Sequence, residues 1–518
     1  MTMASRLLWV DDEIDMLRPH IIFLKNKGYD VTTCNNGSDA LRHCQEKPFD
    51  LILLDENMPG LSGLETLQGI KELQPDVPVV MVTKNEEEDL MDQAIGAQIA
   101  DYLIKPVNPN QILLSLKKNI HQREIVSEAT QSGYSRAFLE LQEQIDANPD
   151  FEQWKELYRR LVRWELQLSE NSAPMADMLA TQKEEANRAF FRFIKEHYED
   201  WVNKPEERPL ISPDVMKRKV FPLLREGRQV YMLVLDNFRY DQWRILSPEL
   251  SEAFDIDEDL YLSILPTATG YARNAIFSGL MPADIKKMYP HLWVEETQEE
   301  GKNLHEEELL RLQMERFRRK EQFTYNKLND SLAAERVIGN ISAMARVPLN
   351  VLVVNFIDIL SHARTDSRMV RELMADEAAY RSITLSWFRH TAVKELFAML
   401  AAQDADIIIT TDHGSIHVDT PIKVVGDREV NTNLRYKLGK NLSYPHRDVF
   451  EMKQPANVGL PTPNLSTTYI FAGGRNFFAY PNNYNHYVQY YRNTFQHGGI
   501  SLEEMLIPLV HLRPKRNR

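Results

Sequence analysis

The chain has 518 residues, of which 43% are hydrophobic and 26% are charged, and its formal net charge is -14. This length predicts two or three domains, and this composition is typical of globular proteins that bury a large apolar core. The negative charge argues against a general nucleic-acid coat protein, because phosphate binding needs a local positive excess, but it leaves open a nucleotide substrate held by metals.

The sequence also predicts where the protein works. Its two cysteines, Cys34 and Cys44, do not make a disulfide framework and fit a reducing compartment. The first apolar stretch is too short for a signal peptide and meets acidic residues at once. No segment approaches the length of a membrane span. We therefore expect a cytoplasmic protein without a membrane span.

Residues 1–120 alternate short apolar runs with amphipathic stretches of helical length. The runs that indicate strands are RLLWV, YDVTTC, FDLILLD, PVVMVT and ADYLI. Such alternation predicts an α/β domain of the doubly wound, flavodoxin-like type, with a parallel sheet.

Polar residues stand where these strands end. Asp11 and Asp12 follow the first strand and Asp55 ends a later one, while Thr83 and Lys105 stand at the ends of the last two. In a parallel sheet these ends share one edge, where ligands of open α/β folds bind. Three carboxylates there repel one another unless a hard cation such as Mg2+ joins them, and a hydroxyl and an ammonium suit phosphoryl oxygens. Strand ends are often polar, but five matches in this order make chance a poor explanation.

These residues closely resemble the receiver domain of two-component response regulators, over essentially all of the first 120 residues. The resemblance implies that Asp55 is phosphorylated by a partner sensor histidine kinase. It implies a Mg2+ site made by Asp11, Asp12, Asp55 and the carbonyl of Asn57. It also implies a phosphate-sensing switch made by Thr83, Lys105 and the aromatic ring of Tyr102.

Residues 121–205 have a different texture, rich in helix formers and almost free of glycine. Apolar positions recur at helical spacing, with breaks at NPD and NSAP, which predicts a small helical bundle or spacer. Its aromatic residues are interpreted as core packing rather than as a ligand site; they are Trp154, Tyr158, Trp164, Phe190, Phe191 and Phe193.

Residues 206–518 return to α/β alternation on a larger scale. Buried strands are expected in QVYMLVLDNF, LNVLVVNFID, ADIIITTD and STTYIFAGG, and a charged helical insertion at about 285–345 could cap a site. Neither a helix-turn-helix segment nor a basic face stands out, which disfavours a DNA-binding transcription factor.

Seven residues at the expected strand ends and loops of this region carry metal-binding side chains. They are Asp236, Thr269, Asp358, His362, Asp412, His413 and His497, with Thr267 as an alternative hydroxyl. Mixed oxygen and nitrogen ligands suit Zn2+, with Mn2+ or Fe as alternatives. Seven ligands exceed one tetrahedral ion and suit two ions that clamp a phosphoryl group. Each residue alone has an ordinary reading, such as a surface i, i+4 pair for Asp358 and His362, but their order along the chain favours a metal site.

That order resembles the alkaline phosphatase superfamily, which includes the nucleotide pyrophosphatase/phosphodiesterases, over about residues 220–510. The segment PTATGYARNAIFSGLMP resembles its PglZ branch. The resemblance implies one zinc ion held by Asp236, Thr269, Asp412 and His413. It implies a second zinc ion held by Asp358, His362 and His497. The resemblance also implies that Thr269, rather than Thr267, is the nucleophile.

Other polar residues near these positions have open roles. Basic side chains that could bind a phosphate or a polynucleotide backbone are Arg273, Lys423, Arg428 and Arg435, although ordinary solvated charge explains each about as well. His417 and Asp419 lie just beyond the metal pair in sequence, where a supporting or surface role is favoured over substrate contact.

A receiver, a helical spacer and a PglZ-type domain in this order resemble the PorX response regulators, which are associated with type IX secretion. The resemblance implies a zinc-dependent phosphodiesterase for oligonucleotides, including cyclic ones, and we expect phosphorylation of Asp55 to promote a homodimer. One alternative is a scaffold that binds zinc and a sigma factor or a secretion component with little catalysis. Another keeps catalysis but acts on a phosphomonoester, a sulfate ester or a modified lipid.

Overall fold

The computed structural model describes two compact units, which divide between Tyr134 and Ser135. The described residues are 5–75, 77–84, 99–116, 119, 122–168, 173–296, 298, 301–366, 368–374, 376–426, 433–464, 466–482 and 484–515. Among the helices in these ranges, none combines the length and the apolar character needed to cross a bilayer.

The N-terminal unit is a five-stranded parallel sheet in the order β2-β1-β3-β4-β5. Its strands are β1 (Arg6–Val10), β2 (Asp30–Cys34), β3 (Leu51–Asp55), β4 (Val79–Thr83) and β5 (Asp101–Ile104). Its helices include α1 (Arg18–Asn26), α2 (Gly37–Glu46), α3 (Gly63–Leu73) and α5 (Pro109–Leu116). This strand order is that of flavodoxin-like folds, so the predicted doubly wound sheet is confirmed.

Both faces of this sheet are covered because alternate residues of each strand point to opposite sides. Leu8 and Val10 of β1 pack with α2 and α3, while Leu7 and Trp9 pack with α1 and α5. Burial on both faces explains why these strands are continuous apolar runs that end in polar residues.

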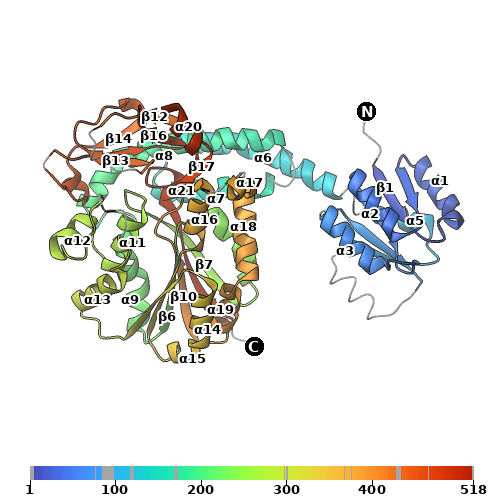
Figure 1. Cartoon of the computed structure of the whole chain (residues 1–518), viewed down its shortest axis with the longest axis horizontal. Helices are drawn as coiled ribbons and strands as arrows, with labels where there is room; N and C mark the ends of the chain where they lie inside the picture. The colour runs from blue at the N-terminus through green and yellow to red at the C-terminus, as the bar shows by residue number, and fades with distance from the viewer. Residues whose placement is uncertain are drawn as a thin grey trace. The chain divides into compact units, whose positions relative to one another are not determined.

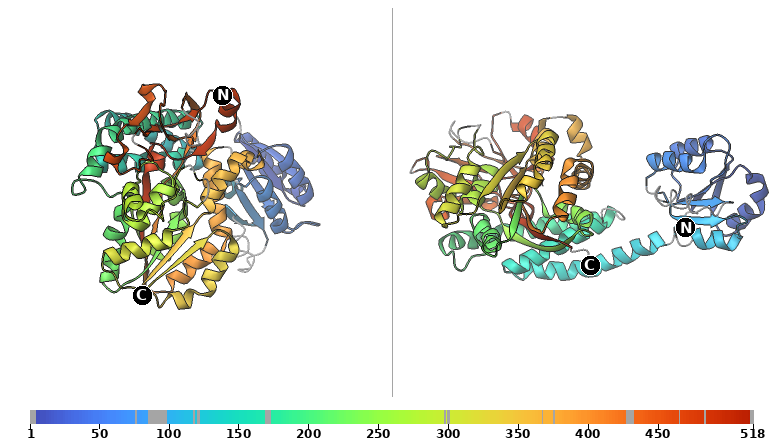
Figure 2. Two further views of the ribbon diagram at one scale, coloured as in Figure 1. Left: turned by 60° about the vertical axis from the view of Figure 1, so that its left-hand side comes forward. Right: turned by 90° about the horizontal axis from the view of Figure 1, so that it is seen from below.

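Three long helices follow, α6 (Gln122–Asp146), α7 (Phe151–Leu168) and α8 (Ala173–Asn203). The rings of Trp154, Tyr158 and Phe190 are no more than 1% exposed, as core packing predicts. From Ser135 onward these helices belong to the same compact unit as the C-terminal domain (Figure 2).

The C-terminal domain is built on a six-stranded sheet in the order β7-β18-β10-β6-β9-β8. Strands β10 (Ala405–Thr410), β6 (Gln229–Leu235), β9 (Leu349–Val354) and β8 (Phe323–Leu328) are mutually parallel. Strands β18 (Leu506–Pro514) and β7 (Phe254–Leu262) complete the sheet in antiparallel pairings. Because β6, β9 and β10 are parallel neighbours, the residues that follow them meet at one edge (Figure 1).

Helices cover this sheet on both faces. They are α9 (Phe221–Arg225), α10 (Tyr240–Leu250), α11 (Thr269–Ser278), α12 (Pro282–Met288), α13 (Glu306–Arg316), α14 (Ser331–Gly339), α15 (Ile341–Met344), α16 (Phe356–Asp366), α17 (Arg368–Leu373), α18 (Glu377–His390), α19 (Ala392–Ala401) and α21 (Leu502–Met505).

Small sheets form a subdomain above one end of the main sheet (Figure 1). Its elements are β11 (Ile416–Val418), β12 (Thr420–Lys423), β13 (Tyr436–Gly439), β14 (Val449–Met452), β15 (Thr468–Ala472), β16 (Asn476–Ala479), α20 (Tyr484–Tyr491) and β17 (Thr494–Gln496).

One expectation about this domain needs correction. The insertion at 285–345 is not wholly helical, because it contains β8, the edge strand beside β9. An edge strand is only partly covered, so FTYNKL lacks the apolar run that marks the central strands. The predicted buried strand in STTYIFAGG is confirmed as β15, which pairs with β13 and β14 in a separate sheet.

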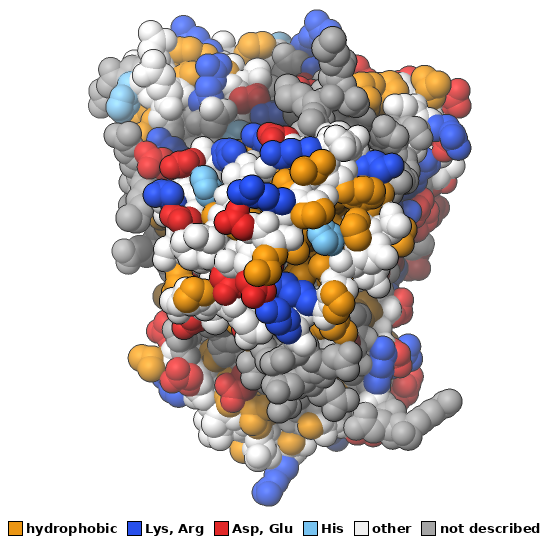
Figure 3. Space-filling model, turned by 90° about the vertical axis from the view of Figure 1, so that its right-hand side faces the viewer, with side chains coloured by type: hydrophobic (Ala, Val, Ile, Leu, Met, Phe, Trp, Pro, Cys, Tyr) orange, Lys and Arg blue, Asp and Glu red, His pale blue; other side chains and the backbone are white. Residues whose placement is uncertain are grey.

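The described surface carries mixed charge. On the face that Figure 3 shows, acidic and basic side chains lie side by side, and the described side chains form no extended basic stripe there.

Candidate active site and receiver site

The first cluster of candidate ligands lies where β6 and β10 end. Asp236 follows β6 directly, and Asp412 and His413 follow β10 after one further residue. All three are buried, and each offers a ligand atom within 4.8 Å of the others. The parallel pairing of the two strands therefore assembles carboxylates that are 176 positions apart in the chain.

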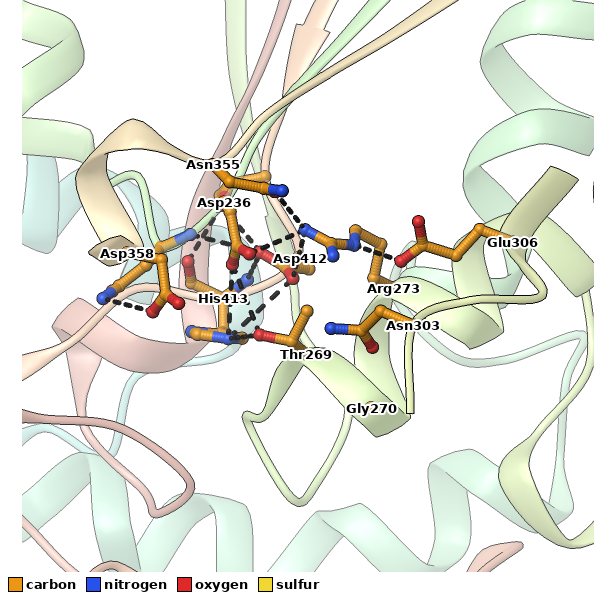
Figure 4. A network of polar contacts seen from close by, with 12 residues as sticks. Asp236, Thr269, Gly270, Arg273, Asn303, Glu306, Asn355, Asp358, Asp412 and His413 are labelled. Carbon is orange, nitrogen blue, oxygen red and sulfur yellow. Dashed lines mark hydrogen bonds and ion pairs between the residues drawn. The ribbon is translucent and has the colours of Figure 1, made fainter. Parts of the chain in front are cut away.

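Thr269 joins this cluster, and Thr267 does not (Figure 4). Thr269 is the first residue of α11, and its Oγ1 lies 3.0 Å from Nε2 of His413 and 3.3 Å from Oδ1 of Asp236. The hydroxyl of Thr267 is fully buried instead and donates to the carbonyl of Gly499 at 2.9 Å. Geometry thus favours Thr269 between the two hydroxyls that the sequence offers.

The second cluster comprises Asp358, His362 and His497, whose ligand atoms also lie within 4.8 Å of one another. Asp358 and His362 are one turn apart on α16, with Nε2 of the histidine 3.5 Å from Oδ2 of the aspartate. His497 follows β17, and its ring stacks on that of His413 with 4.2 Å between centroids. The stacked rings bring the two clusters together.

Both stacked histidines are held in the tautomer that a metal ligand needs. Nδ1 of His413 donates to the carbonyl of Gly414, and Nδ1 of His497 donates to that of Thr267, each at 3.1 Å. Nε2 of each ring is therefore left with its lone pair. Burial lowers the pKa of both imidazoles to about 3, so they are neutral at physiological pH.

The three carboxylates of the two clusters share the guanidinium of Arg273, which pairs with Asp236 and lies 3.9 Å from Asp412. Burial, followed by the neighbouring Asp412, raises the pKa of Asp236 to about 7, and burial also raises the pKa of Asp358 and of Asp412. Among the described residues, Oδ2 of Asp412 accepts no hydrogen bond. Crowded buried carboxylates, imidazole lone pairs and a hydroxyl together fit divalent metal ions of the transition series.

Arg273 supports the first cluster and is not an open substrate contact. Its side chain is 1% exposed, and its guanidinium pairs with Asp236 at 2.7 Å and with Glu306 at 2.5 Å (Figure 4). Glu306 belongs to α13 in the insertion, and Asn355 accepts a further hydrogen bond from Arg273 at 3.1 Å. The expected contact between Arg273 and substrate is therefore replaced by a role in orienting Asp236.

The other residues proposed as basic contacts have mixed outcomes. Lys423 is exposed, and Arg428 lies outside the described residues. Arg435 is buried and pairs with Glu504 at 2.7 Å, so it stabilises the fold. His417 and Asp419 both contact Arg475, at 3.2 and 2.6 Å, and do not join either cluster.

Sequence reasoning missed Asn237, which connects the two clusters. Its backbone N–H donates to Asp412 at 3.3 Å, and its side chain donates to Asp358 at 3.4 Å. Its φ is +60°, a left-handed conformation that asparagine tolerates better than most residues. The sequence signal that could have identified Asn237 is its position directly after Asp236 at the end of a strand.

The receiver residues meet at the carboxyl edge of the N-terminal sheet. Asp11, Asp12 and Asp55 offer carboxylate oxygens within 4.8 Å of one another. Nζ of Lys105 lies 2.8 Å from Asp11 and 3.0 Å from Asp55, and Thr83 is buried at the tip of β4. Burial raises the pKa of Asp55 to about 6, against the opposing effect of Lys105. Asn57 is exposed after β3, and Tyr102 is half-buried in β5.

A buried network of ion pairs joins the linker helices to the C-terminal domain. Its members are Glu165, Lys183, Arg239, Asp241, Glu377, Arg381 and Glu503. Lys183 of α8 pairs with Glu165 of α7 at 2.7 Å and with Glu503 of α21 at 3.1 Å. Although three of its carboxylates lie close enough to hold a metal, three cations already compensate them.

This network reaches the first ligand cluster through Arg239 and Gly414. Arg239 lies three residues after Asp236 and pairs with Asp241 at 2.5 Å. Gly414 follows His413, and a Cβ there would lie 2.1 Å from the carbonyl of Glu503 and 3.2 Å from Cγ of Arg239. Only glycine permits so close a contact at this position. The loops that carry Asp236 and His413 therefore pack against Arg239 and Glu503, and Glu503 is paired with Lys183 of the linker. A cavity of about 430 Å³ lies beside the network, lined by α7, α8 and α18.

Replacing Lys183 by methionine should destabilise this unit by roughly 3–5 kcal/mol, because Glu503 would remain buried without its cation and Glu165 would lose one of its two cations. Chemical denaturation of the full chain measures the loss. Arg188→Met on the same helix removes an exposed pair with Glu184 and should cost less than about 0.5 kcal/mol. Adding Glu165→Gln to Lys183→Met should recover part of the loss; strict additivity would contradict the network.

Family models match three consecutive segments of the chain. The receiver domain of response regulators matches residues 7–117, the linker domain of PorX response regulators matches 124–202, and the alkaline phosphatase-like domain of PglZ from BREX systems matches 215–512. The last match alone covers more than half of the chain.

Curated relatives match over shorter stretches. The transcriptional regulatory protein ZraR of Klebsiella oxytoca is 36% identical over 127 residues, which are 24% of this chain and 29% of ZraR. ResD of Bacillus subtilis, another transcriptional regulatory protein, is 32% identical over 136 residues, which are 26% of this chain and 54% of ResD. The chain thus spans about a third to a half of the length of these relatives. A CheY-like receiver structure from Methanospirillum hungatei is 28% identical and covers 23% of this chain and 97% of its own, with a TM-score of 0.23.

Proposed function

Because the chain belongs to the PorX-type response regulators, with a receiver, a linker and a PglZ alkaline phosphatase-like domain in order, we propose that it is a phosphorylation-controlled, zinc-dependent phosphodiesterase. Its substrates in this proposal are oligonucleotides, including cyclic ones. A receiver domain implies a sensor kinase that phosphorylates it, here on Asp55.

The observation that carries the proposal is the position of the Thr269 hydroxyl. It lies at the start of a helix, 3.0 Å from the lone pair of His413 Nε2 and 3.3 Å from Asp236. The first metal would be held by Asp236, Thr269, Asp412 and His413, and the second by Asp358, His362 and His497. Bound zinc would lower the pKa of a ligated hydroxyl or water and stabilise charge on phosphoryl oxygens.

The side chains of the site have separate tasks in the reaction. Thr269 Oγ1 forms a bond to phosphorus as the bond to the leaving oxygen breaks, and the leaving alcohol takes up a proton. Water then hydrolyses the phosphothreonine, which restores the hydroxyl and releases a phosphomonoester. Arg273 holds Asp236 in place throughout, while the backbone carbonyls of Gly414 and Thr267 accept hydrogen bonds from Nδ1 of His413 and His497.

The proposal also includes regulation and partners. Phosphorylation of Asp55 would add charge beside Lys105 and Thr83 and favour a homodimer, with the linker helices transmitting the change. Membership of the family extends the proposal to control of type IX secretion, with a sigma factor or a secretion component as a further partner.

Metal analysis coupled to a model phosphodiester tests the proposal. The purified full chain should carry about two zinc ions and hydrolyse bis(p-nitrophenyl) phosphate. Chelation should abolish turnover and lower the unfolding midpoint, because ligands that bind only the folded state stabilise it, by roughly 4 kcal/mol at a thousandfold excess over Kd. Re-addition of zinc, rather than manganese or iron, should restore both.

A matched pair of variants separates metal loss from general damage. Asp358→Asn should lower the zinc content toward one ion per chain, while Asp404→Asn, which changes an exposed carboxylate before β10, should leave it unchanged. Stoichiometric zinc without turnover of any diester would instead favour the scaffold. If the chain hydrolysed phosphomonoesters or sulfate esters faster than diesters, it would have another activity of the superfamily and would not be a phosphodiesterase.

A further inference from the structure

The last part of the C-terminal domain has an unusual charge. Residues 453–502 contain no aspartate or glutamate, whereas 75 acidic residues in 518 would place about seven in a stretch of 50. Its charged residues are Lys453, Arg475 and Arg492. In a chain of net charge -14, this segment itself contributes no carboxylate that would repel a polyanion.

Helix α20 concentrates aromatic side chains within this segment. Tyr484, Val488 and Tyr491 pack against the apolar cluster around Ile416 and Phe477, which fixes the inner face of the helix. The outer face carries His486 and Tyr487, which are exposed, and Tyr490, which is half-buried. An exposed row of rings costs solvation without contributing to the core, so it indicates a ligand surface.

The rings of this helix form two stacked pairs that meet edge to face. Tyr487 stacks on Tyr491 with 6.2 Å between centroids and 10° between planes, and His486 stacks on Tyr490 at 6.4 Å and 22°. Tyr487 remains 41% exposed, so part of its ring surface faces solvent. The rings are therefore pre-oriented, which lowers the entropy that a stacking ligand must pay for order.

Both segments that carry the second ligand cluster adjoin α20. The helix leads through β17 directly to His497, so the eight residues from Tyr490 to His497 span at most about 25 Å. On the other side, the guanidinium of Arg371 lies 5.6 Å from the ring centroid of Tyr490. Arg371 is on α17, which follows the helix of Asp358 and His362, and Figure 1 shows α17 and α20 on the same side of the domain.

We propose that the outer face of α20 is a nucleobase-stacking platform, formed by His486, Tyr487 and Tyr490 with Arg371 and Arg492 beside it. It binds single-stranded nucleic acid whose phosphodiester lies at the metal clusters. The inference rests on the proposed phosphodiesterase function and adds the site that distinguishes oligonucleotides from simple diesters.

Nucleic acid fits this surface better than other partners. Aromatic rings stack on any base, and arginine guanidiniums pair with phosphates and also lie over rings. An acid-free segment lacks the carboxylates that would pair with basic peptides. The platform is also polar at its edges, where asparagine and tyrosine hydroxyls replace the aliphatic side chains of an ordinary protein interface.

Binding without turnover tests the platform directly. The full chain, loaded with zinc and carrying Thr269→Ala, is titrated against a fluorescent single-stranded oligoadenylate and against an abasic phosphodiester of equal length. Tyr487→Ala with Tyr490→Ala should weaken oligoadenylate binding about tenfold, the effect of losing a stacked base. Binding of the abasic chain should not change, and the corresponding phenylalanine pair should bind like the parent.

Phe317→Ala, which removes a ring 38% exposed on another element, is the matched control and should leave both affinities unchanged. Equal oligoadenylate affinity in parent and double alanine variant would overturn the platform, as would an equal loss for both probes. Hydrolysis by the otherwise wild-type chain separates the two proposals. If it cleaves no diester, the proposed phosphodiesterase function is wrong, while the fluorescence titration still tests the platform. If it cleaves diesters but its binding does not depend on the bases, only the platform is wrong.

Discussion

Thr269→Ala is expected to lower kcat for phosphodiester hydrolysis by about three orders of magnitude or more, because the attacking hydroxyl is removed. The zinc content should fall by less than one ion per chain, since Asp236, Asp412 and His413 remain to hold the first metal. Thr269→Ser should retain measurable turnover because it keeps the hydroxyl at the start of α11. Steady-state kinetics with metal analysis on the same preparations measures both effects.

The neighbouring threonine supplies the decisive comparison. Thr267→Ser keeps the hydroxyl that donates to Gly499 and accepts from Gly498, so it should leave kcat within a few fold of the parent. Acid quenching during turnover of bis(p-nitrophenyl) phosphate should trap a p-nitrophenyl phosphoryl group on the peptide of residues 266–273, and fragmentation should assign it to Thr269. Full activity of Thr269→Ala with both metals bound, or the trapped group on Thr267, would refute the assignment.

The strand ends of both domains were predictable because they obey one rule. Parallel strands buried on two faces are continuous apolar runs, and they deliver the next polar residue to a shared edge. Asp55 after LILL and Asp412 after IIITT are recognisable on this basis alone. The family resemblance could choose between Thr267 and Thr269 as the nucleophile. The pattern of apolar and polar residues could not, because both hydroxyls lie in the same turn.

What the sequence could not predict are the contacts between residues far apart in the chain. Arg273 resembled a substrate contact because no residue near it in the sequence indicates that it pairs with Glu306 of the insertion. Lys183 resembled any charged helical residue, although folding buries it between Glu165 and Glu503. Gly414 resembled any loop glycine, although a Cβ at this position would lie 2.1 Å from the carbonyl of Glu503. Each of these depends on tertiary packing, which has no periodic signature.

These distant contacts bear on how a receiver could control the site. Glu165, Lys183 and Asn187 belong to the segment matched by the PorX linker model, and they contact Glu503 or its partners beside the ligand loops. A displacement of α7 and α8 would therefore change the ion pairs of Arg381 and Glu503 directly. Such a coupling requires an upstream event that moves the linker, and phosphorylation of Asp55 is the candidate.

Asp55→Ala is expected to abolish the doubling of molecular mass that we predict for the full chain on addition of acetyl phosphate and Mg2+. Asp55 shares the ammonium of Lys105 with Asp11, and Nζ of Lys105 lies 3.0 Å from its oxygen, so a phosphoryl group there would have a cation already in place. Lys105→Met should still be phosphorylated, but a smaller fraction of it should double in mass, because the cation that would bind the phosphoryl group is lost. Sedimentation velocity with phosphate analysis on the same samples measures both quantities.

Asp30→Ala is the matched control for this experiment. Asp30 is an exposed carboxylate at the opposite, N-terminal end of β2, so its removal changes the charge of the domain by the same amount and leaves the carboxyl edge intact. This variant should double in mass like the parent. If Asp55→Ala still doubled in mass, the switch would not depend on this carboxylate. If the parent became phosphorylated and stayed a single chain, the phosphoryl signal would have to act on the linker within one molecule.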